Sequence, residues 1–238
     1  MHKAAVLLTV IGTLSIPAAA PRAQEQPAIA QQKMATYYLV LLNKGSGPAA
    51  SSTEEARVRD GHIKHFDKLA ADGIAHVAGP IGDDGPIRGI AILSATSTEH
   101  ARELANADPA VQAGRFAPEI LAFMAPAGWF HKPATPPSTE QLYFGFLKSG
   151  PSRSQDAETA QRLQKEHLAY MDGQHKEGKL VMAGPFLQGG ARRGIVIYRV
   201  ADAAEAKTRA EGDPMIKAGR LVVELHPWHV ARGVFRTP

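Results

Sequence analysis

The chain has 238 residues, and 27 Lys and Arg against 23 Asp and Glu give it a formal charge of +4 at pH 7. Apolar residues make up 44% and charged residues 21%, which excludes an intrinsically disordered chain. The absence of Cys excludes a disulfide scaffold, a thiolate metal site and a cysteine nucleophile, and a mild charge without a basic run argues against a nucleic-acid partner.

The first thirty residues have the pattern of a secretory signal peptide. A short basic start precedes an apolar run from Ala4 to Ile16, and small residues follow. This run is shorter than the about 20 apolar residues that a transmembrane helix needs. An uncleaved membrane anchor is therefore the weaker alternative. Cleavage after Ala20 or after Ala30 fits the small-residue rule. We expect residues 1–30 to be removed, leaving a periplasmic or secreted protein with no membrane association.

Strand and helix signals then alternate along the chain. Residues 36–42 are rich in β-branched and aromatic side chains, which predicts a strand. Residues 53–72 predict a helix, because apolar residues and a histidine recur at spacings of four, four and three and Gly73 follows as a C-cap. The residues on this face are Val58, His62, Phe66 and Leu69.

The next signals complete a βαββαβ unit. Residues 75–78 predict a short strand, which Gly79–Pro80 is expected to end, and a glycine-rich turn leads to a strand over 89–95. Ser97 is a suitable N-cap for a helix over 98–106, and 116–123 predicts the last strand. This order is that of a ferredoxin-like domain.

The same unit occurs twice. Shifted by 105 residues, the sequence matches itself without a gap, with 23 identities in 85 positions from residue 36 to 120. We therefore predict two repeats, at 35–125 and 140–232, joined by a Pro-rich linker at 126–139. The matches include His62 with His167, Ala78-Gly79-Pro80 with Ala183-Gly184-Pro185, Arg88 with Arg193, and Asp108-Pro109 with Asp213-Pro214.

This order predicts how the repeats pack. In a ferredoxin-like unit both helices lie on one face of an antiparallel sheet, so the other, apolar face must be covered. The second repeat is the natural cover. The predicted fold class is α+β, with two ferredoxin-like repeats packed sheet to sheet as an intrachain pseudo-dimer. Ligand clefts are expected between helices and sheet or between the sheets, and pairing beyond the pseudo-dimer stays open.

The repeated motifs resemble those of the YciI-like (YCII-related) family, within the dimeric α+β barrel superfamily. The shared pattern is a helix His, an Ala-Gly-Pro, an Ala-Asp-Pro-x-x-x-Ala-Gly and a last strand ending in Pro-Trp or Pro-Phe. Two departures are Gly212, where the family has Ala, and Ala122–Phe123, where the second repeat has Pro227–Trp228. The resemblance implies an intrachain α+β barrel, a His–Asp active site and small-molecule chemistry. One relative is a dehydrochlorinase acting on a hydroxylated aromatic.

The histidines and aspartates that recur together are the candidate catalytic residues: His62, Asp108, His167 and Asp213. A carboxylate bonded to one imidazole nitrogen fixes the tautomer and leaves the other nitrogen to exchange a proton near neutral pH. We therefore expect a cofactor-independent lyase or isomerase, with pairing within or across the repeats left open. The alternative is a non-catalytic small-ligand-binding or structural module, in which each Asp caps a helix before Pro and each His is a core residue.

Four further residues are candidates for contacting a small-molecule substrate: Tyr38, Tyr143, Arg88 and Arg193. The tyrosines could equally fill the core, and the arginines could be solvated turn residues. Four histidines without a counterpart in the other repeat are expected at the surface: His65, His76, His100 and His175. His226 and His229 flank Pro227–Trp228, but no partner stands at ligand spacing, so we expect no metal.

Overall fold

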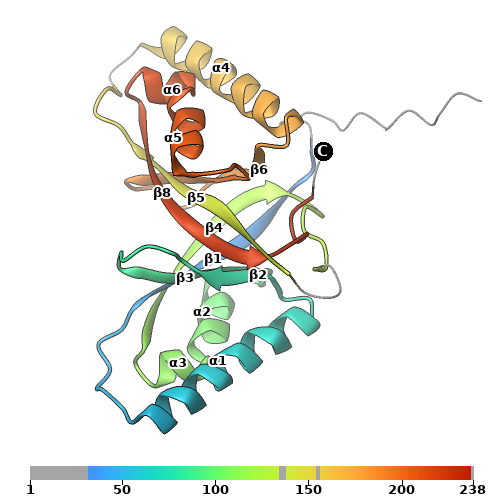
Figure 1. Ribbon diagram of the computed structural model, residues 1–238. Helices are drawn as coiled ribbons and strands as arrows, with labels where there is room; N and C mark the ends of the chain where they lie inside the picture. The colour runs from blue at the N-terminus through green and yellow to red at the C-terminus, as the bar shows by residue number, and fades with distance from the viewer. Residues whose placement is uncertain (1–31, 134–137, 154–155, 237–238) are drawn as a thin grey trace, which may run out of the picture.

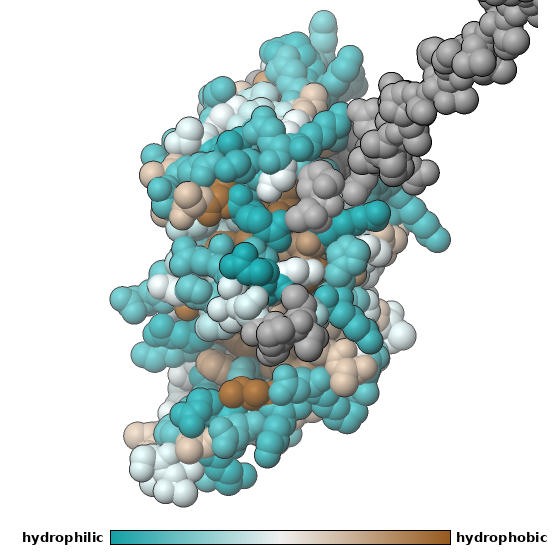
Figure 2. Space-filling view, turned by 45° about the vertical axis from the view of Figure 1, so that its right-hand side comes forward, coloured by the Kyte–Doolittle hydropathy of each residue, from teal (hydrophilic) through white to brown (hydrophobic). Residues whose placement is uncertain are grey.

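The computed structural model describes residues 32–133, 138–153 and 156–236 (Figure 1). The predicted signal peptide, at 1–30, and residues 134–137 of the predicted linker lie outside this part of the chain. Within the described residues, no helix combines the length and the apolar character that crossing a membrane requires. On the face shown in Figure 2, hydrophilic side chains predominate and hydrophobic residues are visible in small patches among them.

The first repeat forms one antiparallel sheet of strand order β2-β3-β1-β4, with its helices on one side. The last strand runs three residues beyond the predicted 116–123, and a short helix follows Asp108 where none was predicted. The elements are β1 (Met34–Lys44), α1 (Ser52–Ala71), β2 (Ala75–Pro80), β3 (Ile87–Leu93), α2 (Thr98–Asn106), α3 (Pro109–Gln112) and β4 (Phe116–Pro126).

The second repeat copies this arrangement in a sheet of order β6-β7-β5-β8. Its last strand ends at Ala231, the position equivalent to Pro126 at the end of β4, so the departure at Pro227–Trp228 does not alter the strand's end. The elements are β5 (Thr139–Ser149), α4 (Ala157–Lys176), β6 (Leu180–Pro185), β7 (Arg192–Tyr198), α5 (Ala203–Glu211), α6 (Pro214–Lys217) and β8 (Leu221–Ala231).

The two sheets pack face to face, as predicted, and the helices lie at opposite ends of the molecule (Figure 1). Side chains alternate between the faces of a strand, so Leu39 and Leu41 of β1 enter the core between the sheets, whereas Val40 and Leu42 pack under the helices. The core between the sheets is buried and combines aliphatic with aromatic side chains. Its large, fully buried aromatic residues include Trp228, Phe123, Phe144 and Phe146.

The glycine of each Ala-Gly-Pro motif lies where the repeats cross. A Cβ on Gly79 would overlap the carbonyl oxygen of His229 in β8, and one on Gly184 would overlap that of Met124 in β4. The Trp228 indole N–H donates to the Gly79 carbonyl at 3.1 Å across the same junction. The motif does end β2 and β6, as expected, but its glycine also lets the last strand of the other repeat approach.

A contact between a histidine and an aspartate also joins the repeats. Nδ1 of His226 in β8 lies 2.7 Å from the Asp83 carboxylate in the β2–β3 turn. Burial opposes ionisation of Asp83, but the hydrogen bonds from His226 and the Gly85 N–H outweigh it, so the pKa of Asp83 is lowered.

Because the pKa of Asp83 is lower in the folded than in the unfolded protein, its ionised carboxylate stabilises the fold. This stabilisation is complete above the unfolded pKa of about 3.9 and is lost as the pH falls through the lower, folded pKa. We therefore expect the urea midpoint of the wild type to fall more steeply below about pH 4 than that of Asp83→Asn. Parallel curves for the two proteins would contradict a role of this carboxylate in joining the repeats.

Candidate active site

The structure brings His62 and Asp108 together. His62 lies on α1, and its Nδ1 is 2.7 Å from Oδ2 of Asp108. The His62 ring also meets Phe66 and Phe116 at centroid distances of 5.1 and 5.4 Å. Its side chain is 25% exposed, whereas that of Asp108 is 1% exposed. The carboxylate therefore accepts from Nδ1–H, and Nε2 is left with the free lone pair.

Asp108 performs two tasks at once. It is the N-cap of α3, where Oδ1 accepts the N–H of Ala110 at 2.9 Å and Pro109 occupies the first helical turn. This is the capping role that Asp before Pro predicts. Since the cap uses one oxygen, the other is available to His62. The two interpretations of the Asp-Pro motif therefore hold together at this position.

The second repeat has the same pair, and pairing is within each repeat. Nδ1 of His167 on α4 lies 2.6 Å from Oδ2 of Asp213, which caps α6 through the N–H of Met215 at 2.8 Å. The His167 side chain is 10% exposed, less than half the value for His62. The two pairs thus form equivalent hydrogen bonds, and they differ in how far the histidine side chain is exposed to solvent.

A cleft of about 780 Å³ opens beside His62, between α1 and the edge strand β2. It is mainly apolar. Ala231 of β8 and Val234, which follows β8, complete its wall, and so does the segment that follows β4. The apolar lining includes Ile63, Phe66, Ala75, Val77, Ile90, Phe116 and Phe130.

Cationic side chains outnumber the acidic one around this cleft. Arg59, Arg88 and Lys132 line it together with Asp67. His76 contributes a neutral wall, because burial lowers its pKa, and its ring stacks on Phe130 at 4.6 Å. A guanidinium near an apolar surface suits a planar molecule that carries an anionic group.

The other predicted substrate contacts lie elsewhere. Tyr38 is buried with Ala101 of α2 and does not line the cleft of His62. Tyr143 belongs to the core under the helices of the second repeat, where its hydroxyl accepts from Gln141 at 2.8 Å. Arg193 is exposed at the start of β7. Of the four, the structure brings only Arg88 into the cleft of His62.

One prediction about the unmatched histidines is wrong. His175 is buried, with Nδ1 3.0 Å from the carbonyl of Leu180, whereas His76 is partly buried and lines the cleft. The helix face of His175 gave the only available signal, since it places the ring toward the sheet. The role of Phe130 was also missed, because it lies in a stretch that we assigned to the linker.

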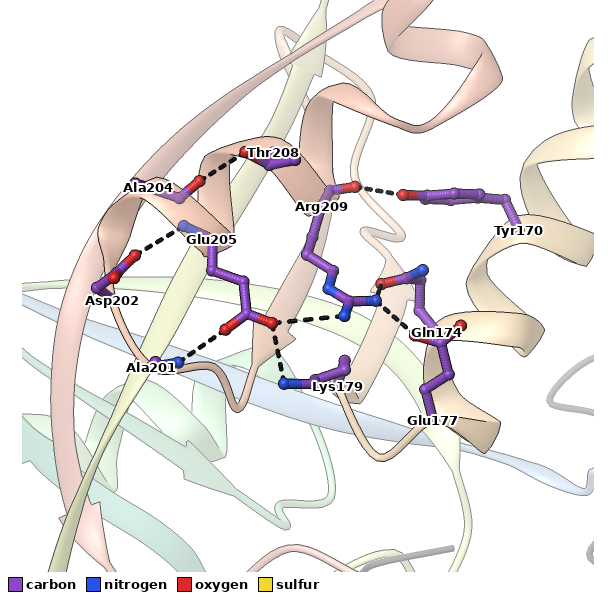
Figure 3. Close-up of polar contacts among 10 residues, drawn as sticks. All are labelled: Tyr170, Gln174, Glu177, Lys179, Ala201, Asp202, Ala204, Glu205, Thr208 and Arg209. Carbon is purple, nitrogen blue, oxygen red and sulfur yellow. Dashed lines mark hydrogen bonds and ion pairs between the residues drawn. The ribbon is translucent and has the colours of Figure 1, made fainter.

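The departure at Gly212 has a steric cause. Tyr170 of α4 directs its hydroxyl to the carbonyl of Arg209 at 2.8 Å (Figure 3). A Cβ on Gly212 would collide with this hydroxyl. In the first repeat His65 takes the place of Tyr170, bonding the Leu104 carbonyl at 3.0 Å, and Ala is accommodated. The change from Ala to Gly therefore accompanies the larger tyrosine and leaves the Asp213 cap intact.

Similarity to known proteins agrees with this architecture. The family model for the YCII-related domain matches residues 36–123 and 146–229. A chlorite dismutase from Candidatus Nitrospira defluvii superposes with a TM-score of 0.54 at 8% identity, covering 81% of this chain and 90% of that one. A heme-binding protein from Thermus thermophilus gives 0.50 at 13% identity, covering 84% and 93%.

A smaller match is 5-chloro-2-hydroxyhydroquinone dehydrochlorinase from Burkholderia phenoliruptrix AC1100, at 24% identity. It covers 35% of this chain and 90% of its own, with a TM-score of 0.28. No curated protein matches the chain in sequence. The structural neighbours establish the fold as a chlorite dismutase-like dimeric α+β barrel.

Proposed function

This chain belongs to the YCII-related domain family, and we propose that its first repeat is a small-molecule enzyme in which His62 transfers a proton with the help of Asp108. One observation carries the proposal. Nδ1 of His62 is held at 2.7 Å by a buried carboxylate, while the same ring lines a cleft of about 780 Å³. A histidine that only filled the core would not border such a cleft.

The hydrogen bond defines what each nitrogen does. Because Nδ1–H donates to Asp108, Nε2 is the basic nitrogen and accepts a proton from a C–H or O–H of the substrate. The imidazolium that forms is stabilised by the adjacent carboxylate. Return of the proton to a different substrate atom completes an isomerisation. Expulsion of a leaving group with its electron pair completes an elimination instead, and His62 then releases its proton to solvent. Neither sequence of steps requires a cofactor.

The lining favours a small aromatic or enol-like anion as substrate. Phe66, Phe116 and Phe130 offer ring faces and edges to a planar molecule. Arg88 also borders the cleft, and although its charge acts on Asp83, it has no salt bridge within 4.0 Å among the described residues, so its guanidinium can pair with a carboxylate or phenolate. A negative charge that develops on an enolate oxygen would be stabilised by the same cation.

Exchange of substrate hydrogen in D2O tests the proposal whatever the final product of the reaction is. Phenylpyruvate, an enolisable aryl keto acid, is a suitable first probe, followed by hydroxylated aromatic acids. We expect the protein to accelerate C–H exchange measured by proton NMR, with a sigmoid or bell-shaped pH–rate curve. His62→Gln should lower the rate about 10²- to 10⁴-fold while the circular dichroism spectrum is retained. A rate equal to that of wild type in this variant would refute proton transfer by His62.

The second candidate function is binding without turnover in the same cleft. Haem is the test ligand, since one structural neighbour is described as a heme-binding protein. The residues fit such a group in part: Nε2 of His62 is a nitrogen that can ligate iron, and Arg88 could pair with a propionate. A Soret shift on hemin addition that is lost in His62→Gln would favour binding. Hydrogen exchange with no Soret shift would favour the enzyme.

A further inference from the structure

The segments that follow β4 and β8 are equivalent, and one buried residue of each packs against the opposite repeat. Each turns on a glycine with positive φ, Gly128 at 71° and Gly233 at 85°, which L side chains rarely adopt. The next residue is Trp129 after β4 and Val234 after β8, and both are buried. The phenylalanines that follow form a bridge between the two segments. At equivalent places, one repeat therefore receives an indole and the other an isopropyl group.

Trp129 fills the second repeat at the place where the first repeat has its cleft. Its indole N–H donates to the carbonyl of Val181 in β6, and its ring lies 4.8 Å from that of His175 on α4. Leu180, at the start of β6, is also fully buried beside this contact. The space between α4 and β6 thus contains an indole, an imidazole and an isobutyl group.

The residues at the equivalent places around the His62 cleft are all smaller. Val234 replaces Trp129, Ala70 replaces His175, and Ala75 replaces Leu180 under the 105-residue shift. All three of these smaller residues line the cleft beside His62. The first repeat therefore has a cleft because the three large side chains that fill the equivalent space beside α4 have small counterparts here.

Polar contacts brace the second repeat further (Figure 3). Glu205 of α5 pairs with Lys179 at 2.9 Å, and Arg209 reaches the C-terminal end of α4 through Gln174 and Glu177 at 2.8 and 2.5 Å. The first repeat has Ile74, His100 and Leu104 at the positions of Lys179, Glu205 and Arg209. It cannot form this network.

We propose that the chain has one open His–Asp site, at His62, and that Trp129 closes the equivalent site at His167. The second pair then ties α4 to the cap of α6 without meeting a ligand. Since Val234 and Ala231 complete the wall of the His62 cleft, each repeat determines access to the other's histidine. The consequence for turnover rests on the proposed function, whereas the accessibility of the two rings does not.

Carbethoxylation by diethyl pyrocarbonate at pH 7 measures accessibility directly. The reagent attacks an unprotonated imidazole nitrogen, and peptide mass analysis of the full chain separates the histidines. His100, on α2 outside the cleft, is the internal reference. We expect His62 to react at least about fivefold faster than His167, whose side chain is 10% rather than 25% exposed.

Substitutions that exchange the side chains of Trp129 and Val234 should change which histidine is accessible to the reagent. Trp129→Val should raise the His167 rate severalfold and leave His100 unchanged, and Val234→Trp should lower the His62 rate by a similar factor. If Trp129→Val fails to fold, His175→Ala with Leu180→Ala opens the same space from the other wall. Equal rates for the two histidines in the wild type, or an unchanged His167 rate in a folded opened variant, would overturn the proposal.

Turnover gives a separate readout with the phenylpyruvate exchange assay. One open site predicts loss of exchange in Val234→Trp and wild-type exchange in His167→Gln. Exchange that falls by half in His167→Gln would show that both sites work and would overturn the inference. Absence of exchange in the wild type, with the expected carbethoxylation pattern, would refute the proposed function and leave the closed second site standing.

Discussion

Gly184→Ala is expected to lower the free energy of unfolding by about 3 kcal/mol or more. The added methyl group would overlap the carbonyl oxygen of Met124 and press on the ring of Phe123, which is fully buried between the sheets. Backbone atoms of a paired strand cannot turn aside as a flexible side chain can, so β4 must move away from β6. Urea unfolding followed by circular dichroism measures the loss.

A second glycine provides the matched control. Gly173 lies within α4, and a Cβ there would meet nothing within 4 Å. Gly173→Ala should therefore raise the free energy of unfolding by about 0.5–1 kcal/mol, through the higher helix propensity of Ala. Gly79→Ala should behave like Gly184→Ala, because it meets the carbonyl of His229. If Gly184→Ala and Gly173→Ala had similar midpoints, a close crossing of the repeats at Gly184 would be ruled out.

The fold was largely predictable from the sequence, because it rests on patterns that are local and repeated. The β-branched and aromatic residues of 36–42 and the helical spacing from Val58 to Leu69 define the elements. The 105-residue repeat then supplies a cover for the apolar face of each sheet. The structure differs from the prediction in the ends of elements, such as Pro126 in place of Phe123 at the end of β4. It also has a short helix after Asp108 that was not predicted.

The His–Asp pairs were also within reach of sequence reasoning, but the difference between them was not. His62 and His167 belong to the same motif, and identical motifs predict identical sites. What distinguishes them is their exposure, 25% against 10%, and the packing of Trp129, which follows β4, against His175 of α4. Such a contact follows from where the segment after β4 goes once the sheets have closed. No periodicity within one repeat encodes it.

Asp108→Asn is expected to lower the exchange rate about 10²- to 10⁴-fold with little loss of stability. The reason lies in the cap of α3. The N–H of Ala110 donates to Oδ1 of Asp108. An Asn must therefore place its amide oxygen there, because its NH2 group would otherwise face the N–H of Ala110, donor against donor. Its NH2 group then faces Nδ1 of His62 and donates to it. The imidazole proton moves to Nε2, and the nitrogen that we propose as the base loses its lone pair.

Two comparisons separate this tautomer effect from a structural one. Asp108→Ala removes both the cap and the partner of His62, so it should cost about 1 kcal/mol or more of stability in addition to activity. Asp213→Asn makes the same change at the cap of α6 and, because we propose that His62 has the one open site, should leave exchange at the wild-type rate. The Nδ1 and Nε2 shifts of the His62 ring, measured by 15N NMR, report the tautomer in each variant. If Asp108→Asn moved the proton to Nε2 and exchange continued at the wild-type rate, His62 could not be the base.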